Sequence, residues 1–533
     1  MKDTDTTHSH RRFRSDSRGV SPVIGAVLML AVLMLLITVL QTTAIPALNA
    51  QGEFQHNQEA QTDIVRLDAT ADRIAAVGTG ETATVAVGYR YPPRMVFVNP
   101  PPVAGVLRTT EARQVTISNA RARGETGDFW NGTTRTYETT TLVYEPAYNE
   151  YEDAPETVYE PWAVYNRDDE QTVALTPTDL VDGRRISLVA LDGELLASNS
   201  DTASVNLVPN SAPVRTVTIR NDTTPITISV PTALRRDTWL RLLDDELDEA
   251  GTDDDAYVTN VTCRQAPPAP CGELTLTLEP GSYALALGEL AVGSDASRES
   301  AAYLTDVEGN TTSVPEGGRQ RLVVEARDRY DNPVFGVSVE ATIERGDGVL
   351  VRVSPTTEGD GRATFVYEAP EDVNGSQSVV VAARFGTGDR QRTVTFNLRS
   401  IDLDGSSTEE TTASSASTVT GVDGTVDSRN IRGSDRGREA SFNITTAAPV
   451  TITGFSVTTR NELEGRPFVD RGTTFGGTEL PVRFAGELQI ALRDIDASRD
   501  LPISEFVDPT DDTADIVVVL EFEDGSTRAF GLA

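Results

Sequence analysis

The sequence is poor in the side chains on which most catalytic and metal sites depend. Its 533 residues include three histidines: His8 and His10 precede the one long apolar run, and His56 follows it closely. A Ser-His-Asp triad or a multi-histidine zinc site is therefore not expected in the rest of the chain. No glycine-rich phosphate loop joins a strand pattern to a helix pattern. We expect no cofactor, no metal site and no enzymatic activity.

Cysteine is equally scarce. Cys263 and Cys271 flank the segment RQAPPAP. A close pair around a proline-rich turn indicates a local disulfide that closes a hairpin, which fits an oxidising exterior. A metal site would need further ligands nearby, and the sequence offers none there.

Lysine is almost absent. Lys2 is the only one, so 45 of the 46 basic residues are arginine, and the formal net charge is −35. Nucleic acid is excluded as a partner because it needs a basic surface. An acidic, lysine-poor chain resembles the proteins of halophilic archaea, where concentrated salt suppresses the repulsion between surface charges.

Long apolar runs are also missing, with one exception near the start. Val20 to Leu40 carries no charge, and as a helix it would be about 31 Å long, enough to cross a hydrocarbon core. Lys2 and four arginines precede it, and the next basic residue is Arg66. This asymmetry predicts a single-pass protein of the cell membrane with a cytoplasmic N-terminus and most of the chain outside. A secretory signal would have a shorter apolar region and a clearer cleavage site.

The segment RGVSPVIGAVLML resembles the N-terminal motif of archaeal type IV pilins and archaellin-like proteins. The resemblance implies cleavage by a prepilin peptidase between Gly19 and Val20, with Arg18 before the cut and Ser21-Pro22 after it. It also implies membrane lipid, the peptidase and other pilin-like helices as partners. The alternative is a plain anchor that is never cut. Filament formation is a separate hypothesis. The size of the chain favours either a minor or tip subunit or a cell-surface protein that borrows only the export motif.

Apolar residues recur at helical spacing directly after this run. Ile64, Leu67, Ala71, Ile74 and Ala75 predict a helix from about Gln51 to Val77, ended by Gly78. The helix either extends the membrane helix outward or packs independently on the next domain.

The remaining chain alternates apolar and polar residues between turn signals, which predicts strands with one wet face. We expect a mainly β fold: an N-terminal transmembrane helix and its extension, followed by several antiparallel β-sandwich-like domains. The expected segments are a basic leader (1–19), a pilin-like helix (20–41), a membrane-proximal helix (42–78), a β-rich region of one or two domains (79–303), an immunoglobulin-like sandwich (304–400), a Ser/Thr-rich linker (401–427) and a C-terminal β domain (428–533).

Residues 304–400 resemble the bacterial immunoglobulin-like group 1 domain of invasin-type adhesins. The motif residues of this family lie at Asp328, Asp331, Asn332, Pro333, Val334, Gly336, Val337, Val339, Thr357, Asp360, Gly361 and Ala363. The resemblance implies that they set turns and inward faces of a β-sandwich and carry no chemistry.

Further features are compatible with an exterior location. Six sequons are candidates for glycosylation: Asn131, Asn221, Asn260, Asn310, Asn374 and Asn443. Trp130, Trp162 and Trp239 could form a sugar platform, but we expect them to pack in cores. Together these features predict a haloarchaeal surface protein with a structural or adhesive role. The alternative is a membrane-anchored hydrolase or solute-binding protein, because catalytic pairs cannot be recognised by inspection among 81 acids.

Overall fold

The computed structural model describes residues 22–168, 171–248, 256–267, 269–293, 298–387, 390–402, 419–428, 437–459, 474–475, 478–496, 506–507 and 516–532. It begins with one continuous helix, formed by α1 (Pro22–Val39), the π-helical turn η1 (Leu40–Ala44) and α2 (Ile45–Val77). The π turn ends at Ala44, two residues before Pro46, whose ring cannot fit an unbroken α-helical ladder. Gly78 ends the helix with φ +73°, and its N–H bonds to the Ile74 carbonyl at 2.7 Å.

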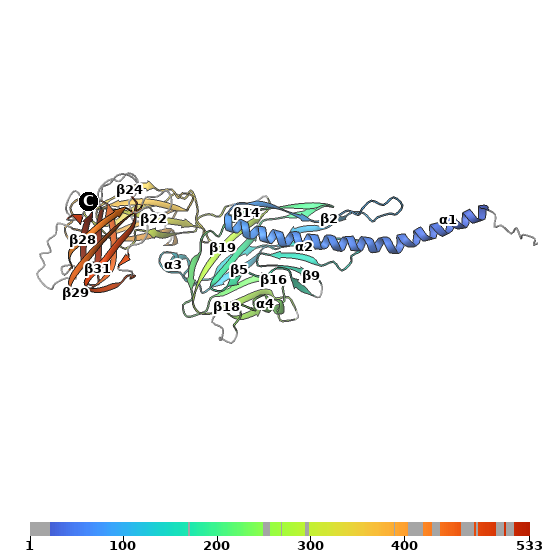
Figure 1. Ribbon diagram of the computed structural model, residues 1–533, viewed down its shortest axis with the longest axis horizontal. Coiled ribbons are helices and arrows are strands. Elements are labelled where there is room, and N and C mark those ends of the chain that lie inside the picture. The colour runs from blue at the N-terminus through green and yellow to red at the C-terminus, as the bar shows by residue number, and fades with distance from the viewer. Residues whose placement is uncertain are drawn as a thin grey trace, which may run out of the picture.

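The C-terminal part of this helix lies against two sheets (Figure 1). The first sheet has the order β1-β14-β19-β12-β11, with β15 also paired to β19, and the second has the order β10-β9-β8-β7-β4-β13. Strands of the first sheet are β1 (Glu81–Ala86), β11 (Val181–Asp182), β12 (Arg185–Asp192), β14 (Thr202–Ser211), β15 (Val217–Arg220) and β19 (Ser282–Val292). Strands of the second are β4 (Val106–Thr109), β7 (Leu142–Glu145), β8 (Glu156–Glu160), β9 (Ala163–Arg167), β10 (Thr172–Ala174) and β13 (Leu196–Ser198).

A third sheet completes the region 79–303, in the order β17-β18-β16-β5-β6. Its strands are β5 (Arg113–Ser118), β6 (Arg135–Thr139), β16 (Thr227–Thr232), β17 (Val258–Cys263) and β18 (Gly272–Leu278). Short helices α3 (Thr126–Phe129) and α4 (Arg236–Leu242) interrupt the strands, and β2 (Gly88–Tyr89) pairs with β3 (Val103–Ala104). One core joins residues of all three sheets, including Val143, Leu188 and Leu276, and a second core lies around α2.

Pairing is mostly antiparallel, as expected, with two differences. β12 runs parallel to β19, from Arg185↔Ala284 to Asp192↔Ala291. β21 (Thr312–Pro315) runs parallel to β27 (Thr393–Ile401). Both pairs join strands far apart in the chain, so no hairpin turn constrains their direction.

Residues 303–401 form a two-sheet sandwich, named the Ig-like sandwich below. One sheet contains β20 (Tyr303–Glu308), β22 (Arg319–Arg327), β24 (Val349–Ser354) and β25 (Arg362–Glu368). The other contains β21, β23 (Glu340–Arg345), β26 (Gln377–Arg384) and β27, preceded by the 3-10 turn η2 (Arg390–Arg392). Leu322 and Phe365 of the first sheet share a core with Val381 and Phe396 of the second.

The last described strands extend one sheet of this sandwich. They are β28 (Val419–Ser428), β29 (Gly437–Thr459), β30 (Thr474–Phe475), β31 (Val482–Asp496), β32 (Phe506–Val507), β33 (Ile516–Phe522) and β34 (Thr527–Leu532). The first residue of β22 pairs with the last of β29, Arg319↔Thr459, and Ile401 shares a small core with Val517 and Val519. The expected linker is therefore too long at its end, because residues 419–427 belong to β28. Residues 403–418 lie outside the described part.

The described chain is elongated, with α1 at one end and the C-terminal strands at the other (Figure 1).

Candidate functional site

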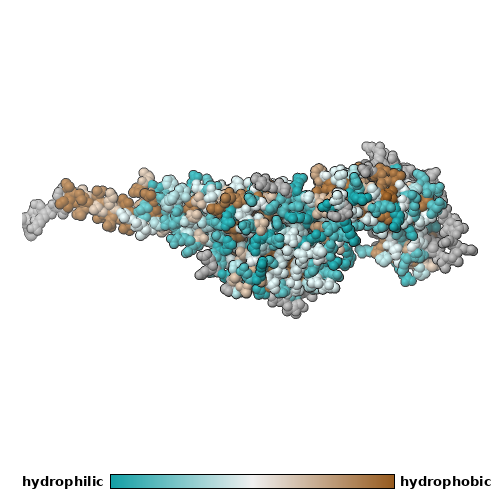
Figure 2. All heavy atoms as spheres, turned by 180° about the vertical axis from the view of Figure 1, so that it is seen from behind, coloured by the Kyte–Doolittle hydropathy of each residue, from teal (hydrophilic) through white to brown (hydrophobic). Residues whose placement is uncertain are grey.

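Helix α1 presents apolar side chains on every side. From Val23 to Val39 its large apolar residues other than Ile37, which is of intermediate exposure, stand between 51% and 75% exposed. None of this apolar stretch is buried in the described chain. They form the brown tip of the molecule in Figure 2. A helix that is apolar all round needs apolar surroundings on all sides. Helix Val23–Val77 is thus long and apolar enough at its start to cross a membrane.

The predicted processing residues fall almost entirely outside the described part of the chain. Arg18, Gly19, Val20 and Ser21 are among residues 1–21, so the structure does not place them. Pro22 is the first residue of α1, a position where the missing N–H costs no helical hydrogen bond.

The predicted apolar stripe of α2 is buried between the first and second sheets. Ile64, Leu67 and Ile74 are at most 1% exposed, and they pack with strand residues such as Val205 and Tyr144. The helical extension of α1 is therefore also the central element of the region that follows it. The helix continues α1 without a break, so the expected extension is confirmed and the alternative of an independent helix is wrong, although the stripe does pack on the sheets.

Glu53 is a buried carboxylate on the same face of α2. Its oxygens accept the backbone N–H groups of Asn149, Glu150 and Tyr151 at 3.1, 2.9 and 2.7 Å, and the hydroxyl of Tyr91. Three N–H dipoles and a hydroxyl satisfy the buried charge. The 149–151 loop is thereby held on the helix.

His56, one turn further along, holds the same loop. Its Nδ1 lies 2.7 Å from the Tyr148 hydroxyl, and the two rings meet edge to face. Burial lowers the pKa of the imidazole, although Glu59 and Asp63 oppose this. His56 thus serves as a neutral link between helix and loop.

A second polar cluster, called the interdomain joint below, links the Ig-like sandwich to the region before it. Asp331 is 1% exposed with φ +69°. Trp130 Nε1–H donates to its two oxygens at 2.8 and 3.0 Å, and the Tyr303 hydroxyl donates at 2.8 Å. Burial raises the pKa of the Asp331 carboxyl to about 7, against the effect of these hydrogen bonds. Trp130 lies far before the sandwich in the chain, so this contact crosses between domains.

Asp328 and Asn332 extend the joint to the first sheet. Ser211 Oγ donates to Asp328 at 2.7 Å, and Asn332 Nδ2 donates to Ser211 Oγ and to the Leu287 carbonyl, both at 2.8 Å. Burial raises the pKa of Asp328. The motif residues that we expected only to shape turns also attach the sandwich to its neighbour.

Arg329 and Tyr330 lie between Asp328 and Asp331 in the chain and complete the joint. The Tyr330 hydroxyl donates to Glu289 at 2.5 Å, and Arg329 Nη2 lies 3.3 Å from the same carboxylate. Tyr137 donates to the Arg329 carbonyl at 3.2 Å. Side chains and backbone thus fix the position of this turn.

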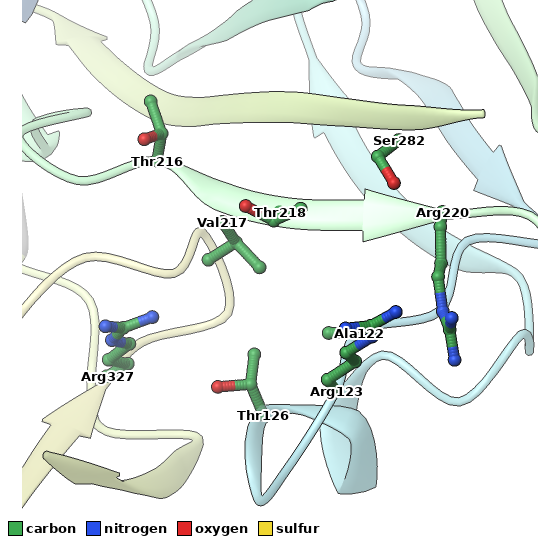
Figure 3. Close-up of a pocket in the computed structure, with 9 residues that line it drawn as sticks. All are labelled: Ala122, Arg123, Thr126, Thr216, Val217, Thr218, Arg220, Ser282 and Arg327. Carbon is green, nitrogen blue, oxygen red and sulfur yellow. The ribbon is translucent and has the colours of Figure 1, made fainter. Parts of the chain in front are cut away.

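One hollow of about 360 Å³ lies beside the joint (Figure 3). Arg327 stands at one end, and Arg123 and Arg220 towards the other. Its lining is Ala122, Arg123, Thr126, Thr216, Val217, Thr218, Arg220, Ser282 and Arg327. This lining includes no histidine or carboxylate that would activate a hydroxyl nucleophile. The hollow therefore gives the hydrolase alternative no support.

Other predicted sites are placed as follows. Cys263 and Cys271 form a disulfide with Cα atoms 4.7 Å apart. Trp130, Trp162 and Trp239 are at most 6% exposed, so they form no surface platform. Asn260 and Asn374 are exposed, and the other sequon asparagines, Asn131, Asn221, Asn310 and Asn443, are partly buried. Among the described residues, no three His, Cys, Asp or Glu side chains gather as a metal site.

The apolar periodicity of the sequence does not identify Glu53, because Glu53 is a polar residue on the same buried face of the helix. The buried face continues back from Ala60 through Asn57, Glu53 and Asn49 at the same spacing. A polar residue in phase with an apolar stripe was the available signal.

Comparisons with known proteins agree with the N-terminal motif. A model of the family described as archaeal type IV pilin, N-terminal, matches residues 18–52. An uncharacterized protein of Archaeoglobus fulgidus is 24% identical over 364 residues. That match covers 67% of this chain and 60% of the relative, so the chain spans less than two thirds of the relative's length.

Solved structures that resemble parts of the chain include surface proteins. Domains 4 and 5 of the S-layer protein SbsC share 13% identity over 24% of this chain and 64% of theirs, with a TM-score of 0.16. The Yersinia pseudotuberculosis adhesin InvE shares 16% over 45% and 61%, with a TM-score of 0.15. The D00-D0 domain of intimin shares 14% over 36% and 92%, with a TM-score of 0.19. At these TM-scores the likeness carries no argument.

Proposed function

We propose that this protein is a surface protein of a halophilic archaeon, held in the membrane by α1 and serving a structural or adhesive role. The helix Val23–Val77 carries the proposal: bare and apolar at its start, buried among sheets at its end. A helix built in this way transmits the position of the membrane directly to the folded region.

The arrangement of the β-rich regions supports a role in which the protein projects from the membrane. The Ig-like sandwich and the C-terminal strands lie at the end opposite α1 (Figure 1). With the basic leader inside, they would reach outward from the cell. The joint around Asp331 restricts bending between the sandwich and the region before it. A stiff arm suits a spacer, an adhesive module or a minor pilin-like subunit.

The acidic surface supports the halophilic setting. A formal charge of −35 with one lysine favours stability in concentrated salt, where repulsion is screened. Partners in this proposal are membrane lipid, a prepilin peptidase and other pilin-like helices.

The N-terminal residue of the protein, isolated from membranes of its host, tests the anchoring and the processing together. We expect membrane-bound protein that begins at Val20. Gly19→Val should retain the leader, whereas Thr7→Val, within the same leader, should not change the cut. Membrane-bound protein with an intact leader would support the uncut anchor instead, and protein found only in the soluble fraction would contradict both.

A further inference from the structure

The loop between β2 and β3 runs back along the helix towards α1 (Figure 1). It covers residues 90–102 and contains five prolines and the run Met95-Val96-Phe97-Val98. Prolines stiffen a segment because each fixes one backbone dihedral. The four-residue run, called the apolar tip below, bears no charge.

Three of the four residues of the apolar tip are exposed in the described chain, and Phe97 is partly buried. Met95 is 104% exposed, Val98 75% and Val96 65%. Exposed large apolar residues grouped in this way are unfavourable in water and mark an interaction site. Many other loops of this acidic chain end instead in polar turn residues, such as Gly-Asp-Gly at 346–348.

Three sets of contacts hold the loop at successive levels of the helix. Its base is fixed where Tyr91 donates to Glu53. Further along, Arg94 Nη1 donates to Asn49 at 2.8 Å. From Glu53 to Asn49, the loop has therefore already followed one turn of the helix towards α1.

The last contact fixes the tip itself. Gln41 Nε2 donates to the Val98 carbonyl at 2.8 Å, and the Val98 N–H donates to Gln41 Oε1 at 3.0 Å. This paired amide contact reproduces the pairing of two strand residues. From Glu53 to Gln41 the loop spans about 18 Å of helix.

The position of the Gln41–Val98 contact along the helix indicates what surrounds the apolar tip. Gln41 directly follows the charge-free run Val20–Leu40, so it lies where the anchor leaves the hydrocarbon. Apolar and aromatic side chains are favoured at that depth. A soluble partner would have no comparable reason to lie at the edge of the anchor.

We propose that the apolar tip inserts into the lipid interface on the outer side of the membrane, beside α1. The inference rests on the proposed anchoring by α1. Both α1 and the apolar tip would then be inserted, and the Gln41–Val98 contact holds them together. Insertion at two places would set the rotation and tilt of the whole molecule relative to the membrane.

Lipid quenching of a fluorophore at single positions tests this inference. Because Cys263 and Cys271 are paired, an added cysteine can be labelled alone. The full chain would carry Met95→Cys, Leu33→Cys in the anchor, or Val349→Cys on the distant strand β24, where the valine is 58% exposed. Each is labelled with an environment-sensitive dye in vesicles of phosphatidylcholine and phosphatidylglycerol that contain doxyl lipid, with aqueous iodide as the opposing quencher.

We expect doxyl lipid to quench the dye at positions 33 and 95, and iodide alone to quench it at position 349. Quenching at position 95 by iodide alone, with position 33 still quenched by lipid, would overturn the loop insertion and leave the anchoring intact. Quenching at position 95 by neither agent would show protein cover, such as a second copy, and would overturn lipid as the occupant. Lack of lipid quenching at position 33 would overturn the anchoring itself.

The role of the paired amide contact has its own control. Gln41→Ala should release the tip, so that lipid quenching at position 95 falls and iodide quenching rises. Gln51→Ala changes an exposed glutamine of the same helix and should leave both unchanged. Unchanged quenching in Gln41→Ala would contradict the positioning of the tip by Gln41.

Discussion

Single polar residues at buried positions hold the parts of this protein together. Glu53 receives four hydrogen bonds from two loops that lie against α2. Because these donors are backbone groups and a tyrosine, the carboxylate orders a loop that has no secondary structure of its own. Removal of the side chain would leave the buried Tyr91 hydroxyl and three partly buried backbone N–H groups without this acceptor.

Glu53→Ala should therefore loosen residues 149–151. An unsatisfied buried donor costs about 1–3 kcal/mol, so we expect the exchange of these amides to accelerate roughly 10- to 100-fold. Hydrogen exchange followed by mass spectrometry measures this. Gln55→Ala, on the exposed face of the same helix, is the control. Equal exchange in both variants would contradict the role of Glu53.

Asp331 should make the interdomain joint sensitive to pH. Its pKa is about 7 when folded and 3.8 ordinarily, so between these values the folded state holds a proton that the unfolded state has lost. The contribution of this group is complete below about pH 4 and is lost as the pH rises through about 7. Asp328 and Glu289 share the joint, and Arg327 and Arg329 offset them.

The test compares unfolding of the wild type and Asp331→Asn by denaturant from pH 5 to pH 8. We expect the wild type to lose stability over this range relative to the variant. Asp360→Asn, on an exposed turn of the same sandwich, should keep the wild-type slope. Parallel pH profiles for the wild type and Asp331→Asn would contradict the assignment.

At the scale of elements, α2 is the helix around which the first two sheets assemble. Its apolar stripe was predictable because apolar residues at a spacing of three and four share one helical face. Its length was underestimated, since the helix starts before Gln51 and merges with α1. Pro46 predicts a break in the helix, but the π turn η1 accommodates the proline and the helix continues.

Leu67→Ala should destabilise this element by about 3 kcal/mol, because the side chain is 0% exposed and its removal leaves a cavity. Leu48→Ala, at a site 54% exposed on the same helix, should change stability by less than about 0.5 kcal/mol. Denaturant unfolding of the full chain in detergent measures both. A similar loss in the two variants would show that the stripe does not form the core described above.

The whole molecule combines an elongated shape with a large charge of one sign. Acids outnumber bases by 81 to 46, so even if every base formed an ion pair, an excess of 35 negative charges would remain. The Debye length falls from about 10 Å at 0.1 M salt to about 3 Å at 1 M. Repulsion between the domains and within them is screened over that range.

Thermal stability should consequently rise with salt. We expect the unfolding midpoint of the full chain in detergent to increase by about 5 °C or more between 0.1 and 2 M KCl. Calorimetry measures this, and sucrose of equal osmolality serves as the uncharged control. A midpoint that is independent of KCl would contradict an adaptation to concentrated salt.

The sequence by itself determined the elements whose signals are local. These are the apolar run, the stripe of α2, the alternating strands and the turn residues around Asn332, because periodicity and turn chemistry act over a few residues. Only the tertiary structure decided which distant segments meet. Three contacts join residues far apart in the chain: the parallel pairing of β12 with β19, the hydrogen bonds of Trp130 to Asp331 and the paired amide contact of Gln41 with Val98. Such contacts depend on the packing of whole sheets and helices, which no local pattern records.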